Sequence, residues 1–273
     1  MAGLLDNVDK AILVLNLSDP EDLHIISSPI TTVAKRTRSR LLIILLHPLF
    51  GTGFGTSTWN IIQRLLAHAY IQATAVSHEM NNVLMNIEVI LRPPRVSLKD
   101  MPVDSWNALF HSDDELRFLL PEKISTLPSF CVMEESSVAE INVITKSSTL
   151  PVVALGGTFD HLHSGHKILL SMAAWIAEKK DLIESLDERM NAVLNFLTLF
   201  KPGVEYNLVP IVDVYGPTAT DPDIQALVVS KETLSGASSN LDVDNMELLR
   251  KAKLSSTYVR QWILKQRGGG EGI

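Results

Sequence analysis

Residues 152–166, Val-Val-Ala-Leu-Gly-Gly-Thr-Phe-Asp-His-Leu-His-Ser-Gly-His, contain the strand-to-helix junction that decides the fold. The apolar run 152–155 is typical of a short strand buried on both faces of a parallel sheet. Gly156 and Gly157 follow it, and two residues without a Cβ let the backbone turn sharply and approach a ligand closely. We therefore predict a strand, a glycine turn and a helix that opens at residues 163–166.

The start of that helix has the chemistry of a phosphate site. A helix N-terminus presents N–H donors without intrahelical partners and the positive end of the helix dipole. His163 and His166 are three positions apart, so both imidazoles are expected on one side of the first turn. Amides and imidazoles together suit a phosphate group that gains negative charge during a reaction.

Other interpretations of the three nearby histidines are weaker. His161, His163 and His166 would be turn and cap residues in a purely structural interpretation. A zinc site is disfavoured, because Cys131 is the sole cysteine and has no partner for a thiolate pair. A Walker loop is disfavoured too, since Gly165 is followed by His-Lys-Ile where that motif requires Gly-Lys-Ser or Gly-Lys-Thr.

Three later segments add polar side chains in the same half of the chain. Residues 210–218 read as a strand that leaves through a Gly-Pro turn, and residues 226–233 as a strand whose carboxyl end is polar. Ligands of open α/β sheets bind at that end of the strands. Residues 253–260 place three hydroxyls at a helix start, followed one turn later by Arg260, and such a cap can hold an anion.

Taken in order, these four segments resemble the His-x-Gly-His nucleotidyltransferase superfamily. The sequence of residues 150–265 is most similar to the eukaryotic-type phosphopantetheine adenylyltransferase family, in its monofunctional fungal form. That resemblance implies transfer of AMP from ATP to 4′-phosphopantetheine, which yields dephospho-coenzyme A and pyrophosphate, in coenzyme A biosynthesis. It also implies an α/β fold, with a Rossmann-like nucleotidyltransferase domain built on a parallel sheet.

The resemblance assigns roles to single residues. The catalytic pair would be His163 and His166, and Mg²⁺ would accompany ATP on its phosphate oxygens without an all-protein cage. ATP would be bound by Gly156, Gly157, Thr158, Phe159, His163, His166, Ser255, Ser256, Thr257 and Arg260. The acceptor substrate would be contacted by Thr158, Ser230, Glu232 and Thr233.

The chain departs from that family in two short stretches. Relatives have a second parallel strand and a loop with a phosphate-binding lysine after the helix that ends near Lys180, whereas here that helix runs on to another helix at Leu182. The region around Asn240 is shortened in a similar way. The sequence leaves open whether these are real deletions, gene-model errors or omitted residues.

Those departures keep two other functions open. One is a catalytically weak homologue that acts as a scaffold or binding subunit among coenzyme A biosynthetic enzymes. The other is a sister nucleotidyltransferase that uses CTP or another acceptor, although the lid sequence typical of cytidylyltransferases is absent. Substrate-dependent release of pyrophosphate distinguishes an active adenylyltransferase from a scaffold.

The pattern along the chain predicts two units and a tail. Residues 1–145 alternate strands (11–15, 41–46 and 83–91) with helices (near 58–75 and 105–120), which predicts an α/β domain of unknown role. Pro93 and Pro94 should end the third strand. Residues 146–265 form the nucleotidyltransferase domain after a polar linker, and residues 266–273 a flexible glycine-rich tail.

Composition narrows the partners and the compartment. The 273-residue chain has a formal net charge of −7, which argues against non-specific binding of nucleic acid. A single cysteine fits a reducing compartment, and the first residues lack the basic segment of a signal peptide. The strongest apolar run, 41–46, is far too short to span a bilayer. We expect a cytoplasmic protein that binds ATP and 4′-phosphopantetheine.

Overall fold

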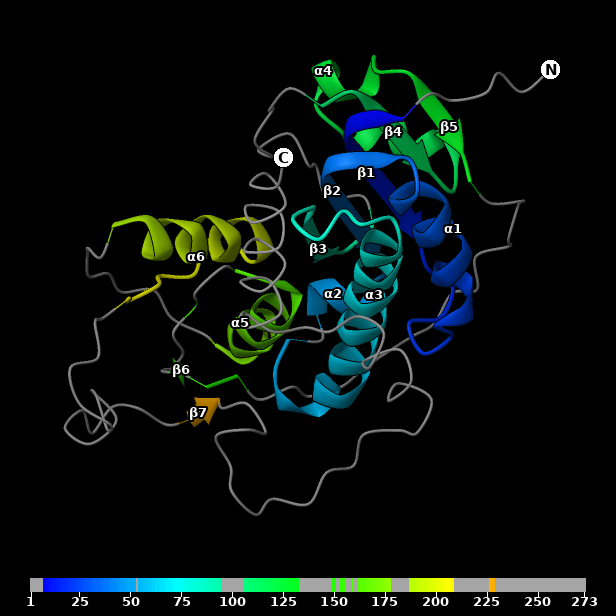
Figure 1. Ribbon diagram of the computed structural model, residues 1–273. Helices are drawn as coiled ribbons and strands as arrows, with labels where there is room; N and C mark the ends of the chain where they lie inside the picture. The colour runs from blue at the N-terminus through cyan, green and yellow to red at the C-terminus, as the bar shows by residue number, and fades with distance from the viewer. Residues whose placement is uncertain are drawn as a thin grey trace, which may run out of the picture.

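The fold is α/β and is built on a parallel sheet, as the sequence predicts (Figure 1). The computed structural model describes residues 7–52, 54–94, 106–132, 149–150, 153–155, 159, 162–177, 187–208 and 226–228. Within these ranges the main sheet has five strands in the order β3-β2-β1-β4-β5, and every paired strand is parallel to its neighbour. The strands are β1 (Val8–Asn16), β2 (Thr37–Leu46), β3 (Asn86–Arg92), β4 (Ala108–His111) and β5 (Ser129–Cys131).

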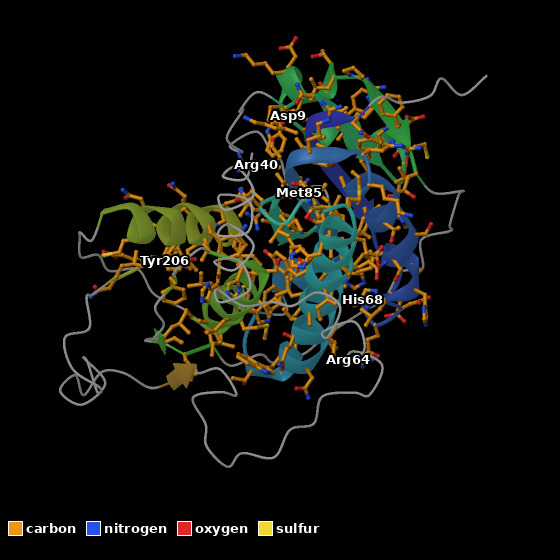
Figure 2. The ribbon with its side chains drawn as sticks, viewed as in Figure 1. Asp9, Arg40, Arg64, His68, Met85 and Tyr206 are labelled. Atoms are coloured by element: carbon orange, nitrogen blue, oxygen red, sulfur yellow. The ribbon has the colours of Figure 1, made fainter. Side chains whose placement is uncertain are left out.

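Helices connect and cover these strands. The chain runs from β1 through α1 to β2 and through α3 to β3, and α1 and α3 pack against each other (Figure 1). His68 of α3 lies between these two helices, where its Nε2 is 2.7 Å from the hydroxyl of Ser27 (Figure 2). The helices are α1 (His24–Ala34), α2 (Leu49–Thr52), η1 (Thr56–Thr58), α3 (Trp59–Glu79), η2 (Asp114–Leu119), α4 (Glu122–Ser125), α5 (Ser164–Ile176) and α6 (Asp187–Phe200).

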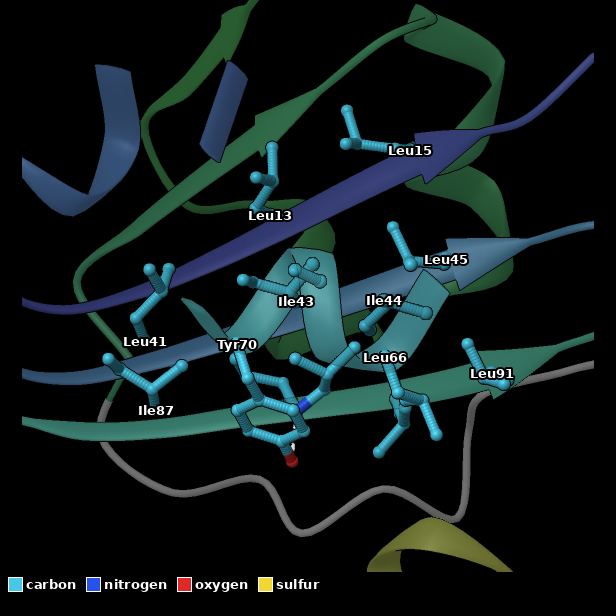
Figure 3. Packing of buried hydrophobic residues seen from close by; sticks show 14 of the residues in the cluster. Leu13, Leu15, Leu41, Ile43, Ile44, Leu45, Leu66, Tyr70, Ile87 and Leu91 are labelled. Atoms are coloured by element: carbon cyan, nitrogen blue, oxygen red, sulfur yellow. Dashed lines mark hydrogen bonds between the residues drawn. The ribbon is translucent and has the colours of Figure 1, made fainter. Parts of the chain in front are cut away.

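The core follows directly from the apolar runs of the first strands. Residues 11–15 and 41–46 are buried on both faces of the sheet, in register with Leu13 opposite Ile43 and Ile43 opposite Val89 (Figure 3). Continuous Ile, Leu and Val runs are what a two-sided parallel strand requires. The same hydrophobic cluster continues into α5 and α6, where it includes the buried rings of Trp175 and Phe196.

The strand at the edge of the sheet, β3, is covered by side chains. It pairs with β2 on one side, and three of its backbone groups are satisfied by side chains. The carbonyl of Ile87 accepts from Lys167 of α5, the N–H of Val89 donates to the Tyr70 hydroxyl (Figure 3), and the carbonyl of Leu91 accepts from Arg92. Buried backbone groups need such partners, and a covered edge cannot recruit another strand.

Most of the predicted elements of the first unit are present. Strands β1 and β2 contain the predicted segments 11–15 and 41–46, and helix α3 covers the helix predicted near 58–75, beginning at Trp59 and ending at Glu79. Strand β3 begins at Asn86, three residues later than predicted, and it ends at Arg92, directly before Pro93, as predicted.

The predicted helix over residues 105–120 is wrong. Its described part, residues 106–120, contains the short strand β4 and the 3-10 helix η2. All four residues of β4 are buried, and Leu109 pairs with Ile12 of β1, so the partner that makes it a strand lies far away in sequence. At the start of η2, the carboxylate of Asp113 accepts a hydrogen bond from the N–H of Glu115.

Two further strands form a second parallel pair, one before helix α5 in sequence and one after it. Strand β6 (Val153–Leu155) pairs with β7 (Ala226–Val228), which correspond to the last three residues of the predicted strand 152–155 and the first three of the predicted strand 226–233. Helix α5 ends at Ile176, and Ala177 is extended and forms a parallel bridge with Leu150. The chain therefore returns to strand pairing directly after α5, where the sequence predicts an uninterrupted helix to about Lys180. Residues 178–186 lie outside the described ranges.

Candidate phosphate-binding site

The candidate site lies at the N-terminus of α5. His163 precedes the helix with an extended backbone (φ −91°, ψ 172°), and its carbonyl accepts the first helical hydrogen bond, from the N–H of Lys167, at 3.1 Å. The His163 side chain makes no capping hydrogen bond, and the first turn contains no acidic residue. The N–H groups of residues 164–166 precede that first bond, so the turn has the donors and the dipole orientation that an anion needs.

Three aromatic rings meet at this helix start. The imidazoles of His163 and His166 stack with their centroids 3.8 Å apart and their planes 18° apart. The ring of Phe159 stands edge-on to His166 at a centroid distance of 5.3 Å. All three residues are half-buried. The three-residue spacing thus brings both imidazoles to one side of the turn, next to the chain that follows the glycines.

Phe159 has an unusual backbone conformation. Its φ of 45° lies in the left-handed region, which is costly for a residue with a bulky side chain. Such strain persists only where the surroundings fix the conformation. At this position it places an aromatic ring against His166.

The lysine that follows His166 points away from these rings. The Lys167 amine is buried and donates to the carbonyl of Ile87 at 2.6 Å and to the side-chain oxygen of Asn86 at 2.5 Å. Burial lowers the pKa of Lys167 to about 8, with Glu88 opposing that shift and Arg40 adding to it. Although a lysine beside a phosphate motif invites assignment as a phosphate ligand, Lys167 connects α5 to β3.

The other end of α5 is held by polar contacts as well. The indole N–H of Trp175 donates to the Thr58 hydroxyl at 2.9 Å. The Lys201 amine donates to the carbonyls of Ala174 and Ala177 at 2.9 and 2.7 Å, which satisfies the carbonyl end of the helix. It also lies 4.4 Å from the ring of Phe54, and burial lowers its pKa to about 8.

Only part of the predicted site falls within the described residues. Phe159, His163 and His166 are brought together at the start of α5. The remaining predicted residues lie outside the described ranges, and their roles stay predictions: Gly156, Gly157, Thr158, Ser230, Glu232, Thr233, Ser255, Ser256, Thr257 and Arg260.

No group of three or more His, Cys, Asp or Glu residues in the described part of the chain could hold a metal ion. None of the helices within those residues combines the length and apolar character needed to cross a bilayer.

Comparison with known proteins places the chain in a family. It is 41% identical over 122 residues to the phosphopantetheine adenylyltransferase of Saccharomyces cerevisiae, a match that covers 38% of this chain and 40% of that protein. A phosphopantetheine adenylyltransferase of Pyrobaculum aerophilum is 33% identical over 138 residues, with 40% of this chain and 89% of the archaeal protein covered. Neither a family model nor a solved structure matches the chain.

The fold and the helix start define a parallel α/β protein with a His-x-Gly-His segment at a strand-to-helix junction. With the similarity to the archaeal protein over most of that protein's length, the chain belongs to the phosphopantetheine adenylyltransferase family.

A further relative matches more of the chain. An uncharacterized protein of Schizosaccharomyces pombe is 30% identical over 210 residues, which covers 65% of each chain. The chain thus spans about two fifths of the budding-yeast relative and just under two thirds of the fission-yeast one. The similarity to the fission-yeast protein is too long to be confined to residues 146–265.

Proposed function

We propose that the protein transfers AMP from ATP to 4′-phosphopantetheine, giving dephospho-coenzyme A and pyrophosphate. The observation that carries this proposal is the pair of stacked imidazoles, 3.8 Å apart, at an N-terminus of α5 that has no acidic first-turn residue. Membership of the phosphopantetheine adenylyltransferase family supports the choice of acceptor.

In this mechanism the acceptor phosphate attacks the α-phosphorus of ATP in line, and pyrophosphate leaves. Such phosphoryl chemistry needs little covalent participation by the protein, so the site works by holding the two reactants in place and by neutralising charge. The helix-start amides and the imidazoles of His163 and His166 donate hydrogen bonds to the oxygens on which charge accumulates. We expect no covalent enzyme intermediate.

Magnesium is a proposed companion of ATP in this reaction. The donors at the start of α5 are amides and imidazoles, which fit phosphate oxygens better than they fit Mg²⁺, a cation that prefers oxygen ligands. The ion would therefore be carried by the phosphate oxygens of ATP and would partly neutralise them.

The residues beyond the described ranges complete the proposal. Thr158 would lie between ATP and the acceptor phosphate, and Ser255, Ser256, Thr257 and Arg260 would close over the triphosphate. Ser230, Glu232 and Thr233 would contact substrate from the segment that follows β7 in sequence.

The test is pyrophosphate release measured with purified full-length protein and MgATP. We expect release that requires 4′-phosphopantetheine and that falls sharply when CTP replaces ATP. Release with CTP, or with a different acceptor only, would favour a sister nucleotidyltransferase. ATP binding without any acceptor-dependent release would favour a scaffold subunit that associates with other coenzyme A biosynthetic enzymes.

A further inference from the structure

The first turn of α5, together with the residue before it, carries two rows of side chains with different surroundings. His163 and His166 form one row, and their stacked rings are half-buried. Ser164 and Lys167 are the next residues along the chain, also three apart, and both are buried. Because residues three apart lie on one face of a helix, the second row is rotated from the histidine row by about one residue.

The second row contacts the first unit of the chain. The hydroxyl of Ser164 is 2.8 Å from the hydroxyl of Thr74 on α3, and both are buried. The Lys167 amine donates to Asn86 and to the carbonyl of Ile87 on β3. All three contacts join residues at least 80 positions apart in sequence, so they depend on the tertiary fold rather than on the helix itself.

These contacts hold helix α5 at two positions along its first turn. The Thr74 hydrogen bond lies at the first residue of α5, and the Lys167 contacts lie almost one turn later. Two anchors on one face fix the rotation of the turn about the helix axis. A rotation would swing the histidine row away from its present position, because His166 belongs to the same turn and His163 is the residue directly before it.

We propose that Thr74 of α3 and Asn86 of β3 are positioning residues for the phosphate site. Through Ser164 and Lys167 they set the placement of His163 and His166. The inference rests on the proposed adenylyltransferase function and extends it, because it gives the α/β unit before α5 an indirect role in catalysis, the placement of the two histidines. Misplacing a catalytic group by about 1 Å can cost up to about a hundredfold in rate.

The experiment compares two substitutions that each remove one hydroxyl contact of α3. Thr74→Val deletes the contact with Ser164, whose length is 2.8 Å. Thr31→Val deletes the 2.7 Å contact with Gln72, which joins α3 to α1 and not to α5. Thr74→Ser restores the hydroxyl, and Asn86→Ala removes an acceptor of Lys167 at an exposed residue, so that variant is expected to fold.

We expect Thr74→Val to lower kcat on the order of tenfold with little change in the KM for ATP, the signature of lost transition-state placement. Thr74→Ser should recover most of that loss, and Asn86→Ala should show a smaller decrease of kcat. Thr31→Val should keep the kcat of the unsubstituted protein even where its melting temperature falls. Equal kcat losses in Thr74→Val and Thr31→Val, or none in Thr74→Val, would overturn the proposal.

A second readout does not require activity. The ring resonances of His163 and His166, assigned with His163→Gln and His166→Gln, report the stacking of the two rings in the ligand-free protein. We expect Thr74→Val to shift both sets of resonances and Thr31→Val to leave them in place. If the unsubstituted protein releases no pyrophosphate, the proposed function fails, while unchanged ring resonances in Thr74→Val would separately refute the positioning role.

Discussion

His166 belongs to the first turn of α5 and faces both His163 and Phe159. In the proposed mechanism this imidazole donates a hydrogen bond to a phosphate oxygen, and that bond would strengthen as charge develops in the transition state, whichever ring nitrogen carries the proton. Its contribution should therefore appear in the rate of the chemical step more than in substrate binding.

We predict that His166→Ala lowers kcat on the order of a hundredfold, with only a modest change in KM. Steady-state pyrophosphate release measures both quantities. The matched control is His24→Ala, because His24 is an exposed histidine in the first turn of α1. An unchanged kcat in His166→Ala, or an equal loss in the control, would contradict the role given to His166.

Lys167 links protonation to stability. Its pKa is about 8 in the folded protein because of burial, against 10.5 in an unfolded chain. Between these pH values the unfolded state binds more protons, so the free energy of unfolding rises with pH. Below pH 8 the folded state bears the full cost of a buried charge, and that cost disappears as the pH approaches 10.5.

We predict that the difference in unfolding free energy between the unsubstituted protein and Lys167→Met changes by about 3 kcal/mol, in favour of the unsubstituted protein, between pH 8 and pH 10.5. Urea unfolding at several pH values measures this difference. Lys201 has a pKa of about 8 as well, but it is present in both proteins, so its effect cancels. A difference that stays constant across this range would contradict the assigned burial of the Lys167 amine.

At the scale of the elements, the edge strand β3 joins the two parts of the chain. Tyr70 of α3 and Lys167 of α5 both satisfy backbone groups of β3. At its end, Arg92 donates to the carbonyls of Leu199 and Phe200 at 2.5 Å each, which satisfies the carbonyl end of α6. An edge strand that would otherwise invite aggregation is thus covered by helices.

Removing the hydroxyl of Tyr70 tests how much this cover contributes. Tyr70→Phe leaves the buried N–H of Val89 without its acceptor, so we predict a loss of about 1–3 kcal/mol in the free energy of unfolding. The control is Tyr206→Phe, since the half-buried Tyr206 hydroxyl donates to the carbonyl of Lys201 and should contribute less. Chemical denaturation measures both, and equal losses would argue against burial of the Val89 contact.

The helices and strands differ in how well a local sequence pattern predicts them. Segments 11–15 and 41–46 are continuous apolar runs, and such runs have few alternatives to a buried strand. Strand β4 has only four residues, and it is a strand because Leu109 and Phe110 pair with β1 about 97 positions earlier. A local pattern carries no information about that partner, so the sequence predicted a helix there.

The candidate site also has features that the local sequence predicts and features that depend on residues far away in sequence. The spacing of His163 and His166 is a local property and predicts two rings on one side of a turn, which the stacked geometry matches. The burial of Lys167 depends on Asn86 and Ile87, residues 80 or more positions earlier, and no signal in the His-x-Gly-His segment reveals it. Likewise, the return of Ala177 to strand pairing depends on Leu150 and is invisible locally.

For the whole molecule, the two predicted units share one hydrophobic cluster. Buried residues of β1, β2 and α3 are continuous with Trp175 of α5 and with Phe196 and Phe200 of α6. The helix that carries the candidate site therefore packs on the first unit rather than on a separate core. The boundary near residue 145 stays a prediction about chain organisation, and the shared cluster predicts that these helices lose their packing together with the main sheet.

The most direct test of the central claim follows the α-phosphate of ATP. Full-length protein is mixed with MgATP labelled at the α-phosphorus and with 4′-phosphopantetheine, and the products are separated. We predict that the label moves to dephospho-coenzyme A, with one pyrophosphate released for each transfer, and that His166→Ala slows this transfer. A folded protein that binds ATP and leaves the label on ATP, or releases it as free AMP, would contradict the proposed adenylyl transfer.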